Sequence, residues 1–87
     1  MNMENIYKIC EKAGKLLAYE GVCYHELYPM SERTMLVHVS GDWKHDHARC
    51  DYLLEKELGL KLVGCKLDEE TDEDWYSAER YYIAKGA

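Results

Sequence analysis

The first part of the chain has apolar side chains three or four positions apart, which is the spacing of an amphipathic helix. We expect this helix to occupy residues 2–21, with Asn2 or Asn5 capping its start and Gly21 following its end. The stripe that should face a core consists of Ile6, Ile9, Cys10, Ala13, Leu16 and Leu17.

A second helical pattern lies between Ser40 and Gly59. Ser40 or Asp42 is expected to cap its start, and Gly59 is expected to end it. If the ring of His47 is buried it needs a hydrogen-bond partner, and Asp51, four residues on, is the local candidate. The predicted buried stripe of this helix is Trp43, His47, Cys50 and Leu54.

Four stretches have the composition or the alternation of β-strands: residues 22–30, 34–40, 60–67 and 75–85. The last stretch would also tolerate a helix, but its Trp and Tyr content favours a strand paired with 60–67 as a hairpin. Its alternation gives two faces, one with Trp75, Tyr81 and Ile83 and the other with Tyr76, Ala78 and Tyr82. In the second stretch, one face is wholly apolar and should meet the core: Met35, Val37 and Val39.

The order helix, strand, strand, helix, strand, strand predicts an α+β fold, a two-layer sandwich with an antiparallel sheet and both helices on one face. We expect residues 1–87 to form a single domain, because a chain of this length builds one modest core. A hydrophobic content of 47% with 32% charged residues is typical of a globular chain, and no apolar run approaches the ~18 residues of a membrane span. With no leader-like segment, we expect a cytoplasmic protein whose four cysteines are reduced.

The net charge of −6 comes from one segment, Asp68–Asp74, which has six acids and no base. Outside it, eleven acids balance eleven bases. In the predicted fold this segment is the tip of the second hairpin, where it either keeps the chain in solution or steers a basic partner towards it. The residues predicted to bind that partner are Asp68, Glu69, Glu70, Asp72, Glu73, Asp74, Trp75, Tyr76, Tyr81 and Tyr82.

The candidates for chemistry lie at the start of the second helix, where His47 and Cys50 share one face and could together reach a metal ion. His45 points away from them, and no CxxC pair supplies further ligands, so no metal or other cofactor is expected. Ser40 beside His38 or His45 lacks a recognisable nucleophile elbow. Without a Gly-rich phosphate loop either, we expect no enzyme.

These observations predict a small, acidic, non-enzymatic protein-binding module whose partner has a basic surface. One version is an inhibitor that mimics nucleic acid, and the small size and concentrated charge resemble those of proteins that phages and mobile elements encode. Direct binding of nucleic acid is not expected, since no cluster of Lys or Arg is present. The alternative is a metal-binding or thiol-dependent protein that uses His47 and Cys50. A homodimer that covers an open sheet face is a further possibility.

Overall fold

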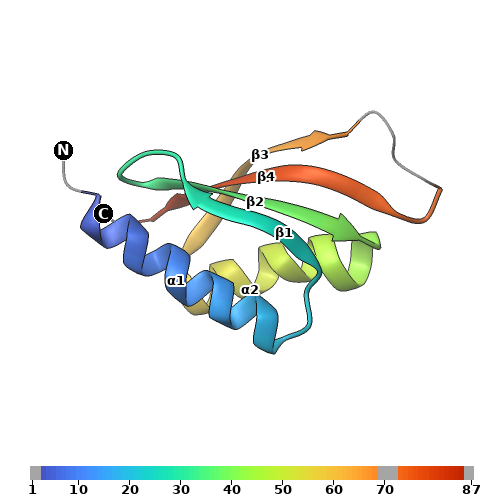
Figure 1. Ribbon diagram of the computed structural model, residues 1–87, viewed down its shortest axis with the longest axis horizontal. Coiled ribbons are helices and arrows are strands. Elements are labelled where there is room, and N and C mark those ends of the chain that lie inside the picture. The colour runs from blue at the N-terminus through green and yellow to red at the C-terminus, as the bar shows by residue number, and fades with distance from the viewer. Residues whose placement is uncertain (1–2, 69–72, 86–87) are drawn as a thin grey trace.

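The computed structural model describes residues 3–68 and 73–85, and it has two helical segments on one face of a four-stranded antiparallel sheet (Figure 1). The predicted α+β architecture is therefore confirmed. The elements are α1 (Glu4–Tyr19), β1 (Tyr24–Pro29), β2 (Thr34–Gly41), a π-helical segment η1 (Trp43–Ala48), α2 (Arg49–Leu58), β3 (Leu60–Leu67) and β4 (Tyr76–Ala84).

The strands lie in the order β1-β2-β4-β3, and every neighbouring pair is antiparallel. The predicted hairpin of 60–67 with 75–85 is present as β3 and β4, so the last stretch is a strand and not a helix. The last strand along the chain, β4, thus occupies the centre of the sheet beside β2.

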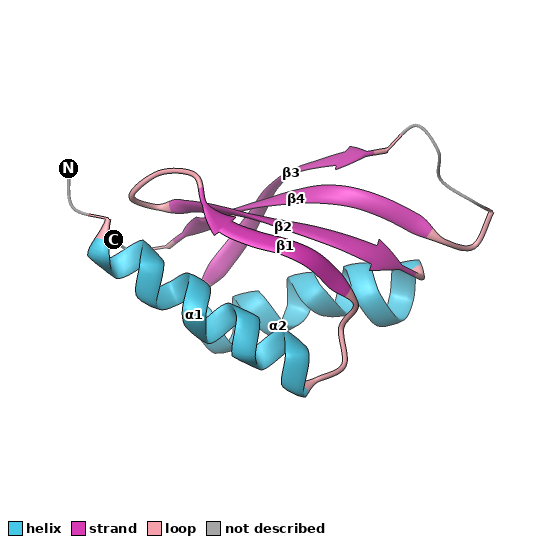
Figure 2. Ribbon diagram, viewed as in Figure 1, coloured by secondary structure: helices cyan, strands magenta, loops and turns pink. Residues whose placement is uncertain are grey.

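The sheet has one face towards the helices and one face away from them (Figure 2). On β2 the predicted inward set, Met35, Val37 and Val39, is fully buried, which confirms its direction. The matching inward set on β4 is the even-numbered one: Ala78, Arg80, Tyr82 and Ala84. We call the other side the open face, because among the described residues no helix covers it.

Helix α1 packs the predicted stripe against the sheet, with Ile6, Cys10, Ala13 and Leu17 buried. Its N-cap is Met3 and makes no side-chain hydrogen bond, so Asn5, which lies inside the helix, is not the cap. Asn2 lies outside the described residues. Gly21 follows the helix end with φ of +75°, a backbone conformation that favours glycine.

The second helix begins after Asp42, whose side chain accepts a hydrogen bond from the backbone N–H of His45. Ser40 lies inside β2, so the expectation that it could be the cap was wrong. The first six helical residues form the wide turn η1, in which the N–H of His47 donates to the carbonyl of Asp42, five residues before it. The helix ends at Gly59, as predicted, with φ of +65°.

The carboxylate of Asp46 fixes the start of this helix to the rest of the fold. It accepts hydrogen bonds from the backbone N–H of Asp42 at 3.0 Å and of Cys23 at 2.9 Å. Gly41 makes room for it, since a Cβ at that position would lie 2.0 Å from Asp46 Oδ2. The turn after β2 is thereby tied to the segment that leads into β1.

Candidate functional site

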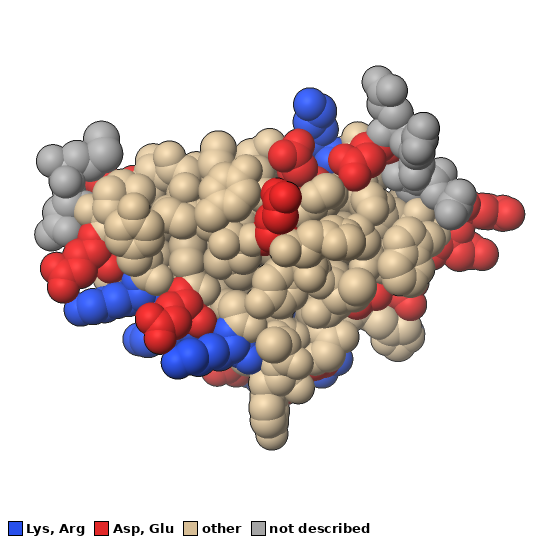
Figure 3. Space-filling view, in the orientation of Figure 1, with Lys and Arg blue, Asp and Glu red and all other residues tan. Residues whose placement is uncertain are grey.

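The predicted partner-binding residues gather partly at one end of the molecule, where β3 and β4 are connected. We refer to the group formed by Asp68, Glu73, Asp74 and the exposed rings of Trp75 and Trp43 as the acidic end. Trp75 is 49% exposed and directly follows the acids. Glu69, Glu70 and Asp72 were also predicted to bind and lie outside the described residues. In Figure 3, acidic side chains gather at the right-hand end of the molecule, whereas basic and acidic side chains alternate along α1.

Trp43 was expected in the buried stripe of the second helix, and this expectation was wrong. The residue is 48% exposed, while His47, Cys50 and Leu54 of the same stripe are fully buried. Its ring stacks on His47 with centroids 5.2 Å apart, and it meets the ring of Tyr76 edge-on at 5.6 Å. Trp43 is the first residue of the second helix and lies beside the last residues of the sheet. Its ring therefore covers the edge of the core and stays partly exposed.

The tyrosines predicted as one binding set lie on different faces of the sheet. Tyr82 is fully buried under α2, so its placement on a binding surface was wrong. Tyr76 lies on the same side and is half-buried against Trp43. Tyr81 points to the open face, where partial burial and then the nearby charges of Glu79 and Tyr28 raise the pKa of its hydroxyl. Alternation along a strand makes this separation unavoidable, because Tyr81 and Tyr82 are consecutive.

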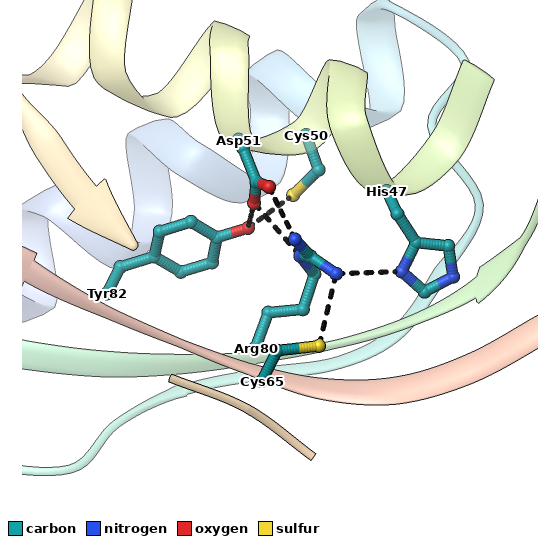
Figure 4. A network of polar contacts seen from close by, with 6 residues as sticks. All are labelled: His47, Cys50, Asp51, Cys65, Arg80 and Tyr82. Carbon is teal, nitrogen blue, oxygen red and sulfur yellow. Dashed lines mark hydrogen bonds and ion pairs between the residues drawn. The ribbon is translucent and has the colours of Figure 1, made fainter. Parts of the chain in front are cut away.

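A buried network around Arg80 was not predicted from the sequence (Figure 4). The Arg80 side chain is 1% exposed and forms a two-pronged ion pair with Asp51 of α2, in which Nε donates to Oδ1 at 2.9 Å and Nη2 donates to Oδ2. Burial opposes the charge of Arg80, but the hydrogen bonds and charge of Asp51 outweigh it, so the pKa of the guanidinium is raised. The Tyr82 hydroxyl also donates to Asp51 Oδ1, at 2.6 Å.

His47 connects this network to the strand beneath it. Arg80 Nη1 lies 3.1 Å from Nδ1 of the ring and, having only protons to give, must be the donor. Nε2 therefore carries the ring proton and donates it to the carbonyl oxygen of Tyr76 at 2.8 Å. Asp51 was the expected partner of His47, and this was wrong because Asp51 is engaged by Arg80.

The thiol of Cys50 lies in the same interior, 3.3 Å from the Tyr82 hydroxyl. Burial raises the pKa of Cys50 to about 12; the hydrogen bond with Tyr82 opposes this rise and the charge of Asp51 adds to it, so the sulfur stays protonated at neutral pH. Both nitrogens of His47 are already bonded within the fold. Neither side chain therefore presents a free donor to a metal ion, although their closeness in the helix was the basis for considering one.

A second thiol lies at the margin of the network, where Arg80 Nη1 donates to Sγ of Cys65 on β3 at 3.3 Å. All four cysteines are free thiols, with Cys10 and Cys50 buried and Cys23 and Cys65 exposed. A shallow depression of about 330 Å³ lies beside α2 and is lined by Asp51, Tyr52, Glu55 and Lys56.

The open face has a polar cluster of its own at the end near the β3–β4 connection. Ser40 Oγ is hydrogen-bonded to His25 Nε2 and, at 2.6 Å, to Ser77 Oγ. His38 Nε2 lies 3.1 Å from Asp68 Oδ2, and its ring meets that of His25 at 5.1 Å. The neighbour of Ser40 is thus His25, and not His38 or His45 as considered from the sequence. Ser40 is only 3% exposed, which leaves a substrate no direct approach to its hydroxyl.

Comparison with known proteins gives no match to a family model, a curated protein or a solved structure. In residues 3–68 and 73–85, no group of three or more His, Cys, Asp or Glu side chains is arranged to hold a metal ion. Neither helix of this described part is long and apolar enough to cross a bilayer.

Proposed function

We propose that this chain is a non-enzymatic protein-binding module whose acidic end engages a basic surface on a partner protein. The observation that carries the proposal is the exposure of Trp75, which is 49% exposed and directly follows Glu73 and Asp74 in the chain, together with Trp43, which is 48% exposed and packs on Tyr76, the next residue after Trp75. Tryptophan is one of the residue types enriched among the energetic anchors of protein interfaces. Carboxylates around such an anchor attract a basic partner and speed the encounter.

The charge layout supports a partner that binds at this end and not elsewhere. The outer surface of α1 carries Lys8 and Lys15 paired with Glu4 and Glu11 at 3.5 and 3.1 Å, so its charges compensate each other. The segment 68–74 contains six acids and no Lys or Arg. A partner surface that normally binds phosphates would meet a comparable density of negative charge here, which is the basis of the inhibitor version of the proposal.

The proposal can be tested with poly-L-lysine as a basic probe and the intrinsic fluorescence of the two tryptophans as the signal. Neutralising Glu73→Gln together with Asp74→Asn should weaken binding several-fold, and added salt should reduce the difference. The matched control is Glu32→Gln with Glu57→Gln, which removes the same charge from exposed positions elsewhere.

Two results would contradict the proposal. In the first, the two double variants lose affinity equally, which would mean that only the total charge matters. In the second, binding leaves the tryptophan emission unchanged, which would place the contact away from Trp43 and Trp75. For a captured natural partner, displacement by double-stranded DNA would test the nucleic-acid-mimic version.

A further inference from the structure

The open face of the sheet has its side chains in rows that the strand register aligns. One row runs across the four strands as Glu26, His38, Glu79 and Lys66. The next row runs as Tyr28, Leu36, Tyr81 and Gly64. In both rows the residues follow the strand order β1-β2-β4-β3.

The charged row has opposite charges at its two edges, with the carboxylate of Glu26 on β1 and the ammonium of Lys66 on β3. Consider a second copy placed face to face and related by a two-fold axis parallel to the strands. This rotation lays β1 of each copy over β3 of the other, and β2 over β4. Glu26 then lies opposite Lys66 of the second copy, and His38 lies opposite its Glu79, so no two like charges meet along this row.

The aromatic row obeys the same symmetry. Tyr28, which is 42% exposed, would lie over Gly64 of the second copy, where no side chain stands in the way. Leu36 is 1% exposed and lies between Tyr28 and Tyr81 in the register, so each copy presents its two tyrosine rings as the contact layer.

The other possible two-fold axis, perpendicular to the strands, keeps each strand over its own counterpart. An axis through the charged row would then place Glu26 over Glu26 and Lys66 over Lys66 of the second copy. Like charges at such short range are unfavourable. The charges of this row therefore favour the axis parallel to the strands, which also allows the aligned packing usual for two sheets.

From this complementarity we propose that the open face is a self-association surface that joins two copies of the chain in an isologous dimer. Four strands ~4.8 Å apart and about eight residues long at ~3.3 Å each give a face of about 500 Å² in projection. A specific interface buries about 800 Å² of accessible surface per partner. The accessible surface of a face is larger than its projected area, because the side chains make the face uneven. The whole face is thus engaged in the dimer.

The dimer goes beyond the proposed function and does not depend on it. Because the axis runs along the strands, both acidic ends lie at the same end of the assembly. The assembly would then offer a basic partner two acidic ends side by side. The self-association surface and the acidic end use different residues, so mass measurements and poly-L-lysine binding test the two proposals separately.

Charge reversal with rescue is the sharpest test, read as molar mass by sedimentation equilibrium. The wild type should shift from 10.2 kDa towards twice that mass as its concentration rises to about 1 mM. Glu26→Lys alone and Lys66→Glu alone should each weaken dimerisation at least about tenfold, since each places two like-charged pairs in the interface. An equimolar mixture of the two variants should dimerise again, because Lys at 26 in one copy then faces Glu at 66 in the other.

Two further variants keep the test decisive. Lys12→Glu makes the same charge change on the exposed side of α1 and should leave the dimer intact. Gly64→Val should abolish dimerisation without unfolding the monomer, since a Cβ at Gly64 meets only Tyr81, at an ordinary 3.6 Å. Circular dichroism verifies the fold of each variant.

The proposal is overturned if the wild type stays monomeric throughout this concentration range. It is equally overturned if Lys66→Glu and Lys12→Glu have the same effect, or if the mixed variants fail to associate. A dimer that survives Gly64→Val would show that another surface is responsible.

Discussion

Removing the charge of Asp51 should destabilise the fold severely, because it leaves Arg80 buried without its counter-ion. In Asp51→Asn the amide can still accept one hydrogen bond, but its NH₂ group then faces the Nη2 donor of Arg80. Breaking a buried ion pair from one side costs about 3–5 kcal/mol, and the 1% exposure of Arg80 leaves its charge almost no access to water. A folded chain of 87 residues has a total stability of about 4–13 kcal/mol, so this loss is a large share of it.

Urea unfolding followed by tryptophan fluorescence measures the loss as a change in the free energy of unfolding. Glu55→Gln is the matched control on the same helix, since its ion pair with Lys85 is exposed at 3.5 Å and should contribute no more than about 0.5 kcal/mol. Replacing both network partners, Arg80→Met with Asp51→Leu, should recover most of the stability, because no unpaired charge is left. A loss below about 1 kcal/mol in Asp51→Asn would refute the reasoning, since it would mean that Arg80 is hydrated in solution.

Three other outcomes follow from the same structure. Burial keeps Tyr82 and Cys50 protonated by raising both pKa values, that of Cys50 to about 12, whereas the unfolded chain ionises these groups from about pH 9. The contribution of these two groups to stability is therefore complete below that pH. As the pH rises further, the free energy of unfolding falls by about 1.4 kcal/mol per pH unit for each group that ionises in the unfolded chain but not in the folded one. Tyr82→Phe should make this fall shallower in urea unfolding measured from neutral to alkaline pH. Gly41→Ala should cost about 2–4 kcal/mol, because the new methyl group displaces the Asp46 carboxylate from its two backbone N–H donors; unchanged thermal unfolding would contradict this. Gly59→Ala should cost about 1 kcal/mol from backbone strain alone, since nothing lies within 4 Å of the added Cβ, and a gain in melting temperature would be the contrary result.

Periodicity predicted the elements well because most of them have one buried face. The alternation in β2 assigned Met35, Val37 and Val39 to the core, and Asp42 and Gly59 marked the limits of the second helix. The same alternation places Arg80 in line with buried Ala78 and Tyr82, so its burial could have been suspected. A pattern of hydrophobicity gives no reason to bury a guanidinium, however, until its partner is known, and Asp51 is 29 residues away in sequence.

The remaining errors also come from contacts between distant segments. Trp43 fits the stripe of the second helix, but the sheet beneath that position has nearly ended, and the ring covers His47 from outside. Ser40 is a good helix cap by residue type, yet β2 continues past it, and its hydroxyl bonds to Ser77 on β4. The periodicity of the sequence contains no information about which strands are neighbours in the sheet.

The central position of β4 has a consequence for how the protein is made. Residues 76–84 are the last of the sheet to leave the ribosome, yet β2 and β3 both pair with them. Until then the sheet of the nascent chain consists of the β1–β2 hairpin alone. Strand β3 has no partner strand, and the apolar side of β2 is incompletely covered. Arg80 and Tyr82 arrive with the same strand, so Asp51 also waits for its partners. The sheet therefore cannot be completed before residues 76–84 have left the ribosome, and a ribosome that stalls shortly before residue 76 holds a chain prone to aggregate.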